Sequence, residues 1–198
     1  MKQNNNIELI KSIANSLVDD DNFNEWIHST NINCYGFARG LTYPDLKQQF
    51  YAPGKLFNIK FGFGEFARTE YTPPIIDKYI MRDSFALEQN VERISFDNIN
   101  ENDGNFYFAL TDFSIIPLGK NDHHWHFICR TQSGIWLHKP NWYQPVQKVN
   151  WSQYGKTFHF DTITQQVGSR NNPESNPIFL PCEGKCFKDY FYKIDFPD

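Results

Sequence analysis

The sequence contains no run of basic residues and no long uninterrupted apolar stretch. Lys and Arg number 19 against 23 Asp and Glu, which gives a formal net charge of −4 at pH 7. Nucleic-acid binding normally requires clustered positive charge, so we expect no nucleic-acid partner. A membrane-spanning helix needs about 18 or more apolar residues in succession, so we expect no membrane insertion either.

Cysteine is scarce, and its four positions are Cys34, Cys129, Cys182 and Cys186. Their spacing is not typical of a disulfide framework and indicates free thiols in a reducing compartment. The first 21 residues are too polar and too acidic for a secretory signal peptide. We therefore expect a cytoplasmic protein, or one secreted without a classical signal peptide.

The chain is nevertheless rich in core-forming residues, since 40% of its 198 residues are hydrophobic and 19 are Phe. This composition predicts a single domain over residues 1–198, with an N-terminal helix within 1–20 as a decoration. Apolar spacing predicts helices over 7–18, 34–40 and 73–87, and strands over 92–96, 105–116, 123–130, 135–139 and 187–195. Turn residues predict a long, partly structured loop over 43–65 and a loop over 168–176. Helices followed by antiparallel strands indicate an α+β fold.

Cys34 is predicted to begin a helix, because the capping residues 29–33 precede it. The N-terminus of a helix carries partial positive charge and unpaired N–H groups, and both favour a thiolate. The same N–H groups can stabilise the oxyanion that forms when a thiolate attacks a carbonyl. Cys34 is therefore a candidate nucleophile.

The histidines follow strand alternation, which places His124 and His126 on one face and Trp125 on the other. His138 lies twelve residues after His126. A hairpin centred near Gln132 predicts that His126 and His138 face each other across the strand pair, on the same side. A base and an orienting group for a nucleophile would then stand together.

These segments resemble those of papain-like cysteine peptidases and amidases of the NlpC and CHAP types. The segment 34–38, Cys-Tyr-Gly-Phe-Ala, is similar to the nucleophile helix of CHAP domains, and 126–138 is similar to the His-strand–turn–strand-His unit of the NlpC group. The chain also resembles uncharacterised bacterial proteins that combine Asn-Cys-Tyr-x-aromatic-Ala with Trp-x-His-Lys-Pro. It departs from the NlpC pattern at the bulky Phe127, where that group often has a small residue.

The resemblance implies a papain-like fold, in which the nucleophile helix packs on an antiparallel sheet. It implies that Cys34 is the nucleophile, His126 the general base and His138 the residue that orients it. The reaction would be hydrolysis of a peptide or protein amide through an acyl-enzyme, with deamidation or acyl transfer as variants and with no metal or organic cofactor. A bacterial effector that acts on a host protein is compatible with this expectation.

Other residues have roles that the sequence leaves open. Asn141 competes with His138 for the orienting role. Asn33 and His28 are candidate oxyanion donors, although helix capping explains Asn33 equally well. The residues expected to contact substrate are His124, Trp125 and Tyr35.

Two alternatives to the cysteine hydrolase also fit the sequence. His124, His126 and His138 form the kind of set that holds a catalytic zinc. The other alternative is that Cys34 is a buried core thiol and the chain an inactive binding domain on the same fold. Cys129 is expected in the core, and Cys182 to Cys186 in a turn before the last strand.

Overall fold

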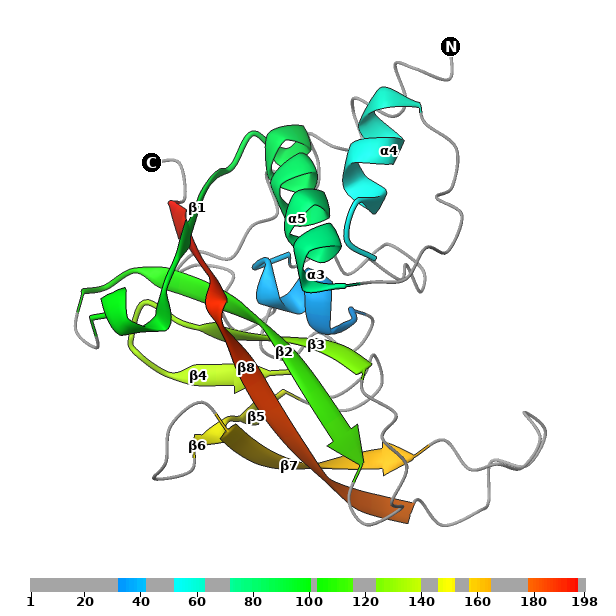
Figure 1. The fold of residues 1–198 in the computed structure, drawn as a ribbon, viewed down its shortest axis with the longest axis vertical. Helices are drawn as coiled ribbons and strands as arrows, with labels where there is room; N and C mark the ends of the chain where they lie inside the picture. Colours follow the sequence, from blue (N-terminus) through cyan, green and yellow to red (C-terminus); the bar gives the residue numbers. More distant parts are fainter. Residues whose placement is uncertain are drawn as a thin grey trace, which may run out of the picture.

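A computed structural model describes residues 32–41, 52–62, 72–100, 103–115, 124–139, 146–151, 157–164 and 178–195 (Figure 1). The expected helix over 7–18, the N-terminal decoration and the loop over 168–176 lie outside these ranges. The described helices are α3 (Cys34–Ala38), α4 (Lys55–Phe61), α5 (Pro73–Leu87) and a 3₁₀ turn (Phe96–Asn98). The prediction of a helix over 73–87 is confirmed at both ends.

The strands pair antiparallel wherever they meet. They are β1 (Asn90–Ile94), β2 (Phe106–Ile115), β3 (His124–Arg130), β4 (Trp136–His138), β5 (Gln147–Lys148), β6 (Asn150–Trp151), β7 (Thr157–Thr164) and β8 (Ile178–Asp195). Helices and an antiparallel sheet together confirm the α+β class.

The sheet curls round so that its two ends meet in one short segment. The strand order is β5-β4-β3-β2-β8-β7-β6, with β1 added beside β8. Only Val149 separates β5 from β6, although these strands stand at opposite ends of that order. The Val149 N–H also donates to the carbonyl of Trp136 on β4, at 3.0 Å. The sheet therefore forms a small barrel with an outer and an inner face.

The helices cover the outer face of this barrel (Figure 1). The apolar cluster on that face, here called the outer core, joins α3 and α5 to alternate residues of the strands, including Phe108, Leu110, Phe127, Cys129 and Leu137. A separate cluster, here called the inner core, contains Ala109, Ile128, Val149, Cys186 and Phe191. Neighbouring strand residues thus fall into different cores, as the two-residue period of a strand requires.

Within the predicted, partly structured loop over 43–65, residues 55–61 form the helix α4, which the sequence did not indicate. Two glycines delimit this helix, because Gly54 and Gly62 both have left-handed backbone conformations, with φ of 88° and 71°. Glycine adopts this conformation without a steric cost, so it serves at both ends of a short helix. The glycines that indicated a loop are the boundaries of a helix.

The last strand begins much earlier than expected. Cys182 and Cys186 lie within β8, and the predicted turn at these positions is wrong. Cys182 pairs with Ile115 and Cys186 with Thr111 on β2, while the N-terminal half of β8 also pairs with β7. Cys129 is fully buried in the outer core, as expected.

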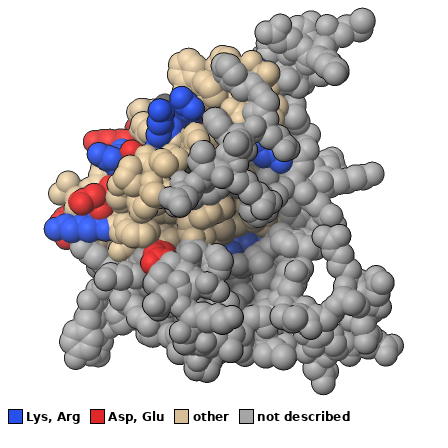
Figure 2. All heavy atoms as spheres, turned by 45° about the vertical axis from the view of Figure 1, so that its right-hand side comes forward, with Lys and Arg blue, Asp and Glu red and all other residues tan. Residues whose placement is uncertain are grey.

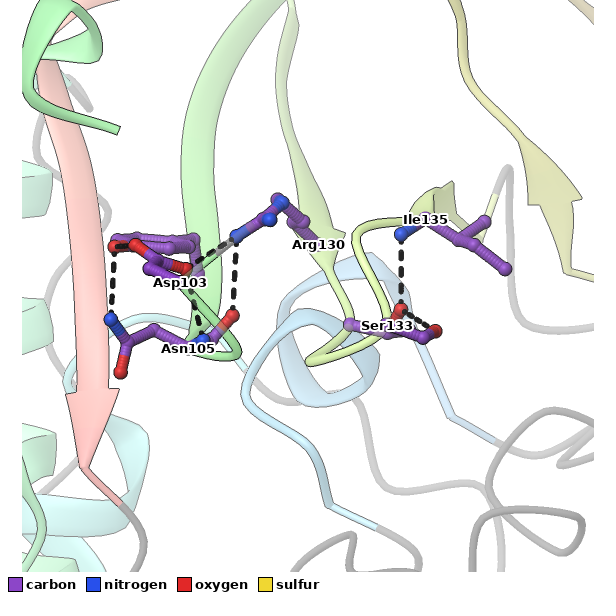
Figure 3. Close-up of polar contacts among 7 residues, drawn as sticks. Asp103, Asn105, Arg130, Ser133 and Ile135 are labelled. Carbon is purple, nitrogen blue, oxygen red and sulfur yellow. Dashed lines mark hydrogen bonds and ion pairs between the residues drawn. The ribbon is translucent and has the colours of Figure 1, made fainter. Parts of the chain in front are cut away.

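Hydrogen bonds fix the hairpin between β3 and β4 (Figure 3). The Ile135 N–H donates to Thr131 Oγ1 at 3.1 Å, and the Thr131 N–H donates to the Ile135 carbonyl at 2.9 Å. At the neighbouring end of β3, Arg130 Nη1 donates to Asp103 Oδ1 at 3.0 Å and to the carbonyl of Asn105 at 3.4 Å. The turn and the loop before β2 are therefore both tied to β3.

Figure 2 shows Lys and Arg side chains interspersed with Asp and Glu side chains on the described part of the face in view. The described ion pairs include Lys188–Asp97 and Arg93–Asp77, at 2.6 and 2.9 Å. Among the described residues, no helix combines the length and apolarity that crossing a membrane would require.

Candidate functional site

Cys34 is the first residue of α3, as predicted. Asn33 caps this helix, because its side-chain Oδ1 accepts the Gly36 N–H at 3.1 Å. At the other end, the Leu41 N–H donates to the Gly36 carbonyl and the Gly40 N–H donates to the Phe37 carbonyl. This pair of bonds is the Schellman arrangement, and Gly40 supplies its left-handed residue with a φ of 73°. A five-residue helix is thus capped at both ends.

Residue Cys34 is partly exposed, but its sulfur is buried and packs against the outer core. Burial of the sulfur raises its pKa to about 12, although backbone hydrogen bonds from Phe127, Tyr35 and Cys34 itself work in the opposite direction. These bonds favour the thiolate because an N–H group donates to a negative sulfur. The site therefore gathers donors around the thiol but leaves the thiol protonated at neutral pH.

His126 and His138 form a buried pair on neighbouring strands. Their Nε2 and Nδ1 atoms are 3.2 Å apart, and the side chains are 2% and 0% exposed. Burial lowers the pKa of His126 to about 3, and burial together with the neighbouring His126 holds the pKa of His138 well below its usual value. Both rings are thus neutral, one donating its N–H to the other.

The hairpin register differs from the predicted one by two positions. The turn is centred on Ser133, and His138 stands opposite Ile128 instead of opposite His126. A shift of two residues preserves the face of a strand, so the two histidines still share one side and meet diagonally. The side chain of Gln147, opposite His138 on β5, forms a hydrogen bond that favours protonation of His138.

The structure does not bring His126 to Cys34. Cys34 packs against the outer core with Trp125 and Phe127, and the rings of Tyr35 and Phe127 lie 4.9 Å apart. His126 alternates with these residues and shares its face with Ile128 of the inner core. The imidazole thus points into the barrel, while the thiol lies outside it. The predicted Cys34–His126–His138 triad is not assembled in this arrangement.

The remaining predicted residues are placed as follows. The Asn33 side chain is committed to the helix cap. Tyr35, expected at a substrate surface, is completely buried and donates its hydroxyl to Asp83 at 2.8 Å. Trp125 is partly buried against the outer core. Residue His124 starts β3, and its side chain lies outside the described part, as do Asn141 and His28.

No protein-family model matches the chain, and no curated protein or solved structure is significantly similar to it.

Two titratable residues that the sequence did not single out are important here. Lys139 directly follows β4 and is completely buried, and this burial lowers its pKa to about 8. Asp83 is completely buried on α5 and accepts hydrogen bonds from α3 and α4. Lys139 belongs to the Trp-x-His-Lys-Pro pattern, so its position was visible in the sequence, whereas its burial was not.

A three-ligand metal set does not occur among the described His, Cys, Asp and Glu residues. In the expected zinc set, the facing nitrogens of His126 and His138 bind each other. The described residues therefore do not present a site that fits zinc.

Proposed function

We propose that the chain is a cysteine-dependent hydrolase on a papain-like fold, with Cys34 as its nucleophile. The observation that supports this most is the environment of the thiol. The sulfur of a partly exposed residue stands at the start of a capped helix and receives backbone hydrogen bonds from Cys34, Tyr35 and Phe127. Donors that stabilise a thiolate also suit the oxyanion of an attacked carbonyl next to that thiolate.

In this proposal Lys139 is the general base. The pairs Cys129–Leu137 and Ile128–His138 define the register of β3 and β4, and the next pair would be Phe127 with Lys139. Continuing the alternation of β4 by one residue would place Lys139 on the α3 side, opposite to His138. Its lowered pKa leaves about a tenth of the amine neutral at pH 7, so that it can accept the thiol proton.

The reaction would then proceed through a thioester. Neutral Lys139 takes the proton of Cys34, and the thiolate attacks the carbonyl carbon of an amide. The carbon–nitrogen bond breaks, and the resulting ammonium returns its proton to the leaving amine. Water hydrolyses the thioester, which releases the acid and restores the thiol.

The substrate class comes from the resemblance alone. Papain-like peptidases and amidases act on peptide amides, including those of cell walls, so we propose a peptide or protein amide as substrate. A host protein attacked by a bacterial effector belongs to the same chemical class.

One observation favours a second candidate, an inactive binding domain on the same fold. Burial raises the pKa of the thiol to about 12, and His126 lies on the other side of the sheet. A domain of this kind needs Cys34 only for packing.

The test combines thiol labelling with a cleavage assay. Cys34 is labelled with iodoacetamide at pH values from 6 to 10, and the extent of labelling is measured by peptide mapping. The native protein is compared with the variants Lys139→Met, Lys139→Arg and His126→Gln. A denatured proteome-derived peptide mixture is incubated with native protein or with Cys34→Ala, and new peptide ends are identified by mass spectrometry.

A hydrolase produces new ends that Cys34→Ala does not produce. Lys139→Met then slows labelling near pH 8, while His126→Gln leaves it unchanged. The binding domain produces no ends, and its labelling rises about tenfold per pH unit throughout, identically in all variants, as expected for an isolated thiol with a very high pKa.

A further inference from the structure

Asp83 on α5 accepts hydrogen bonds from two other helical segments. Its Oδ2 atom accepts the Tyr35 hydroxyl at 2.8 Å and the Gly54 N–H at 2.7 Å, and its Oδ1 atom accepts the Phe57 N–H at 2.9 Å. The carboxyl group is completely buried. One side chain therefore joins α3, α4 and α5.

Asp83 supplies the cap that α4 lacks. Gly54 stands at the N-cap position of α4 and has no side chain that could accept an N–H. The N–H groups at the start of a helix need acceptors, and a carboxylate there also interacts favourably with the helix dipole. Asp83 provides this acceptor from a helix that begins nineteen positions after Gly54.

The helix α3 depends on the same anchor. Five residues are too few for a helix that is stable alone, so tertiary contacts must hold it. Tyr35 bonds Asp83, and Arg39 Nη1 donates to the Tyr35 hydroxyl and to the Ile80 carbonyl, both at 3.4 Å. Arg39 Nη2 donates to Gln89 Oε1. Tyr35 near the start of α3 and Arg39 at its end are thus both hydrogen-bonded to α5, and Arg39 also to Gln89 just after α5.

We propose that Asp83 is a positioning residue that holds Cys34 against the Phe127 backbone through Tyr35, and that its ionisation controls the reactivity of the thiol. This proposal depends on the proposed function only for its biological meaning. The thiol's reactivity can be measured whether or not the chain hydrolyses anything.

The groups that face Asp83 explain why its ionisation matters. From α3 these are the Tyr35 hydroxyl and the Arg39 guanidinium, and from α4 the N–H groups of Gly54 and Phe57. Burial raises the pKa of Asp83 to about 6, although these donors and the Arg39 charge work against the rise. A protonated carboxyl carries a hydrogen of its own and cannot accept all three bonds.

The expected sequence of events follows from these contacts. Below pH 6 the carboxyl gains a proton and one of its three donors loses an acceptor. The hydrogen bond between Tyr35 and Asp83 weakens, and α3 is held less firmly. The hydrogen bond from the Phe127 N–H to the Cys34 sulfur, which favours the thiolate, then weakens as well. The reactivity of Cys34 then falls more steeply than the loss of thiolate alone requires.

The experiment follows the reaction of Cys34 with 4,4′-dithiodipyridine between pH 4.5 and 8. The native protein should show an inflection near pH 6, within a range where the thiol alone gives none. Below it the rate should fall by about fivefold beyond the single-thiol dependence, the factor expected for one buried hydrogen bond. Asp83→Asn should remove the inflection, because its amide does not titrate.

The matched control is Asp77→Asn. Asp77 lies on the same helix and accepts the Tyr192 hydroxyl at 2.9 Å, but it belongs to the β8 side and not to α3. This variant should retain the inflection. Tyr35→Phe keeps the ring against Phe127 and removes only the hydroxyl, so it tests the same link if Asp83→Asn does not fold. The proposal is overturned if native protein and Tyr35→Phe have identical profiles.

A protein that shows the Asp83 inflection but cleaves no peptide would retain this inference and refute the hydrolase. A protein that cleaves through Cys34 without the inflection would do the reverse.

Discussion

The Nε2 atom of His126 lies 3.2 Å from the Nδ1 atom of His138, inside the barrel and away from Cys34. This pair is part of the interior packing in the described arrangement. Because both rings are neutral and buried, their main consequence is a dependence of stability on pH.

We predict that the protein loses stability as the pH falls below about 6.5, where an unfolded histidine begins to bind a proton. The folded pKa values of His126 and His138 are depressed, to about 3 for His126, so the unfolded state binds more protons in this range. Linkage then gives a loss of about 2 kcal/mol per histidine between pH 7 and pH 5. Asp83, whose folded pKa is raised, offsets part of the loss.

Urea unfolding at pH 7 and pH 5 measures this effect. A double variant, His126→Gln with His138→Gln, should be less stable at pH 7 but should lose far less on acidification. An equal loss in native protein and double variant would show that the histidines are not the groups responsible.

The pair Asp103–Arg130 predicts a different effect (Figure 3). Arg130 is 2% exposed, and its Nη1 atom lies 3.0 Å from Asp103 Oδ1. Partial burial opposes the ionisation of Asp103, but donors on Tyr107, Asn105 and Arg130 outweigh it and lower the carboxyl pKa. Asp103→Asn leaves a buried guanidinium without its counter-charge, so we expect a loss of about 1–3 kcal/mol in the free energy of unfolding.

The control for this prediction is Asp97→Asn, which breaks the exposed pair with Lys188. Exposed pairs contribute little, so this variant should unfold at nearly the native urea concentration. If the two variants were equally destabilised, burial of Arg130 would not be the reason that its ion pair contributes more to stability.

We predict that replacing Glu88 with glycine stabilises the protein. Glu88 follows α5 with a left-handed backbone (φ 58°), the only described non-glycine residue with a positive φ. Removing its side chain relieves the steric strain, although glycine also gives the unfolded chain more freedom. We expect Glu88→Gly to raise the free energy of unfolding by about 0.5–1 kcal/mol, measured by urea unfolding.

Glu88→Gln separates this backbone effect from the loss of the Lys60–Glu88 ion pair, in which Glu88 is 83% exposed. It should have nearly native stability. A glycine variant less stable than the glutamine variant would show that the backbone here is not strained.

Local signals predicted the elements whose causes are local. Proline at the first turn defined the start of α5, a strand-like and mostly apolar run defined β2, and the turn signals around 123–130 defined β3. The strands β5 and β6 contain two residues each, and nothing within two residues can specify a strand. They exist because the barrel has to close. The helix α4 similarly depends on a cap from Asp83, which is remote in sequence.

The candidate site shows the same limit. The sequence predicted that Cys34 begins a helix and that His126 and His138 share a face. The sequence could not determine which face of β3 packs against α3. Alternation divides the side chains of a strand between two faces, but it does not show which element packs on each face. Phe127 was the available signal, since a bulky residue after His126 departs from the NlpC pattern. This side chain packs in the outer core, with its ring 4.9 Å from that of Tyr35.

The closure of the barrel at Val149 has a consequence for water. On either side of Val149, β5 forms two residue pairs with β4 and β6 forms two residue pairs with β7. The central strands β2 and β3 form seven pairs with each other. Fluctuations that part a sheet begin where the fewest bonds must break. Solvent and protons would therefore reach the buried imidazoles by local opening of the sheet at Val149, which requires less free energy than global unfolding.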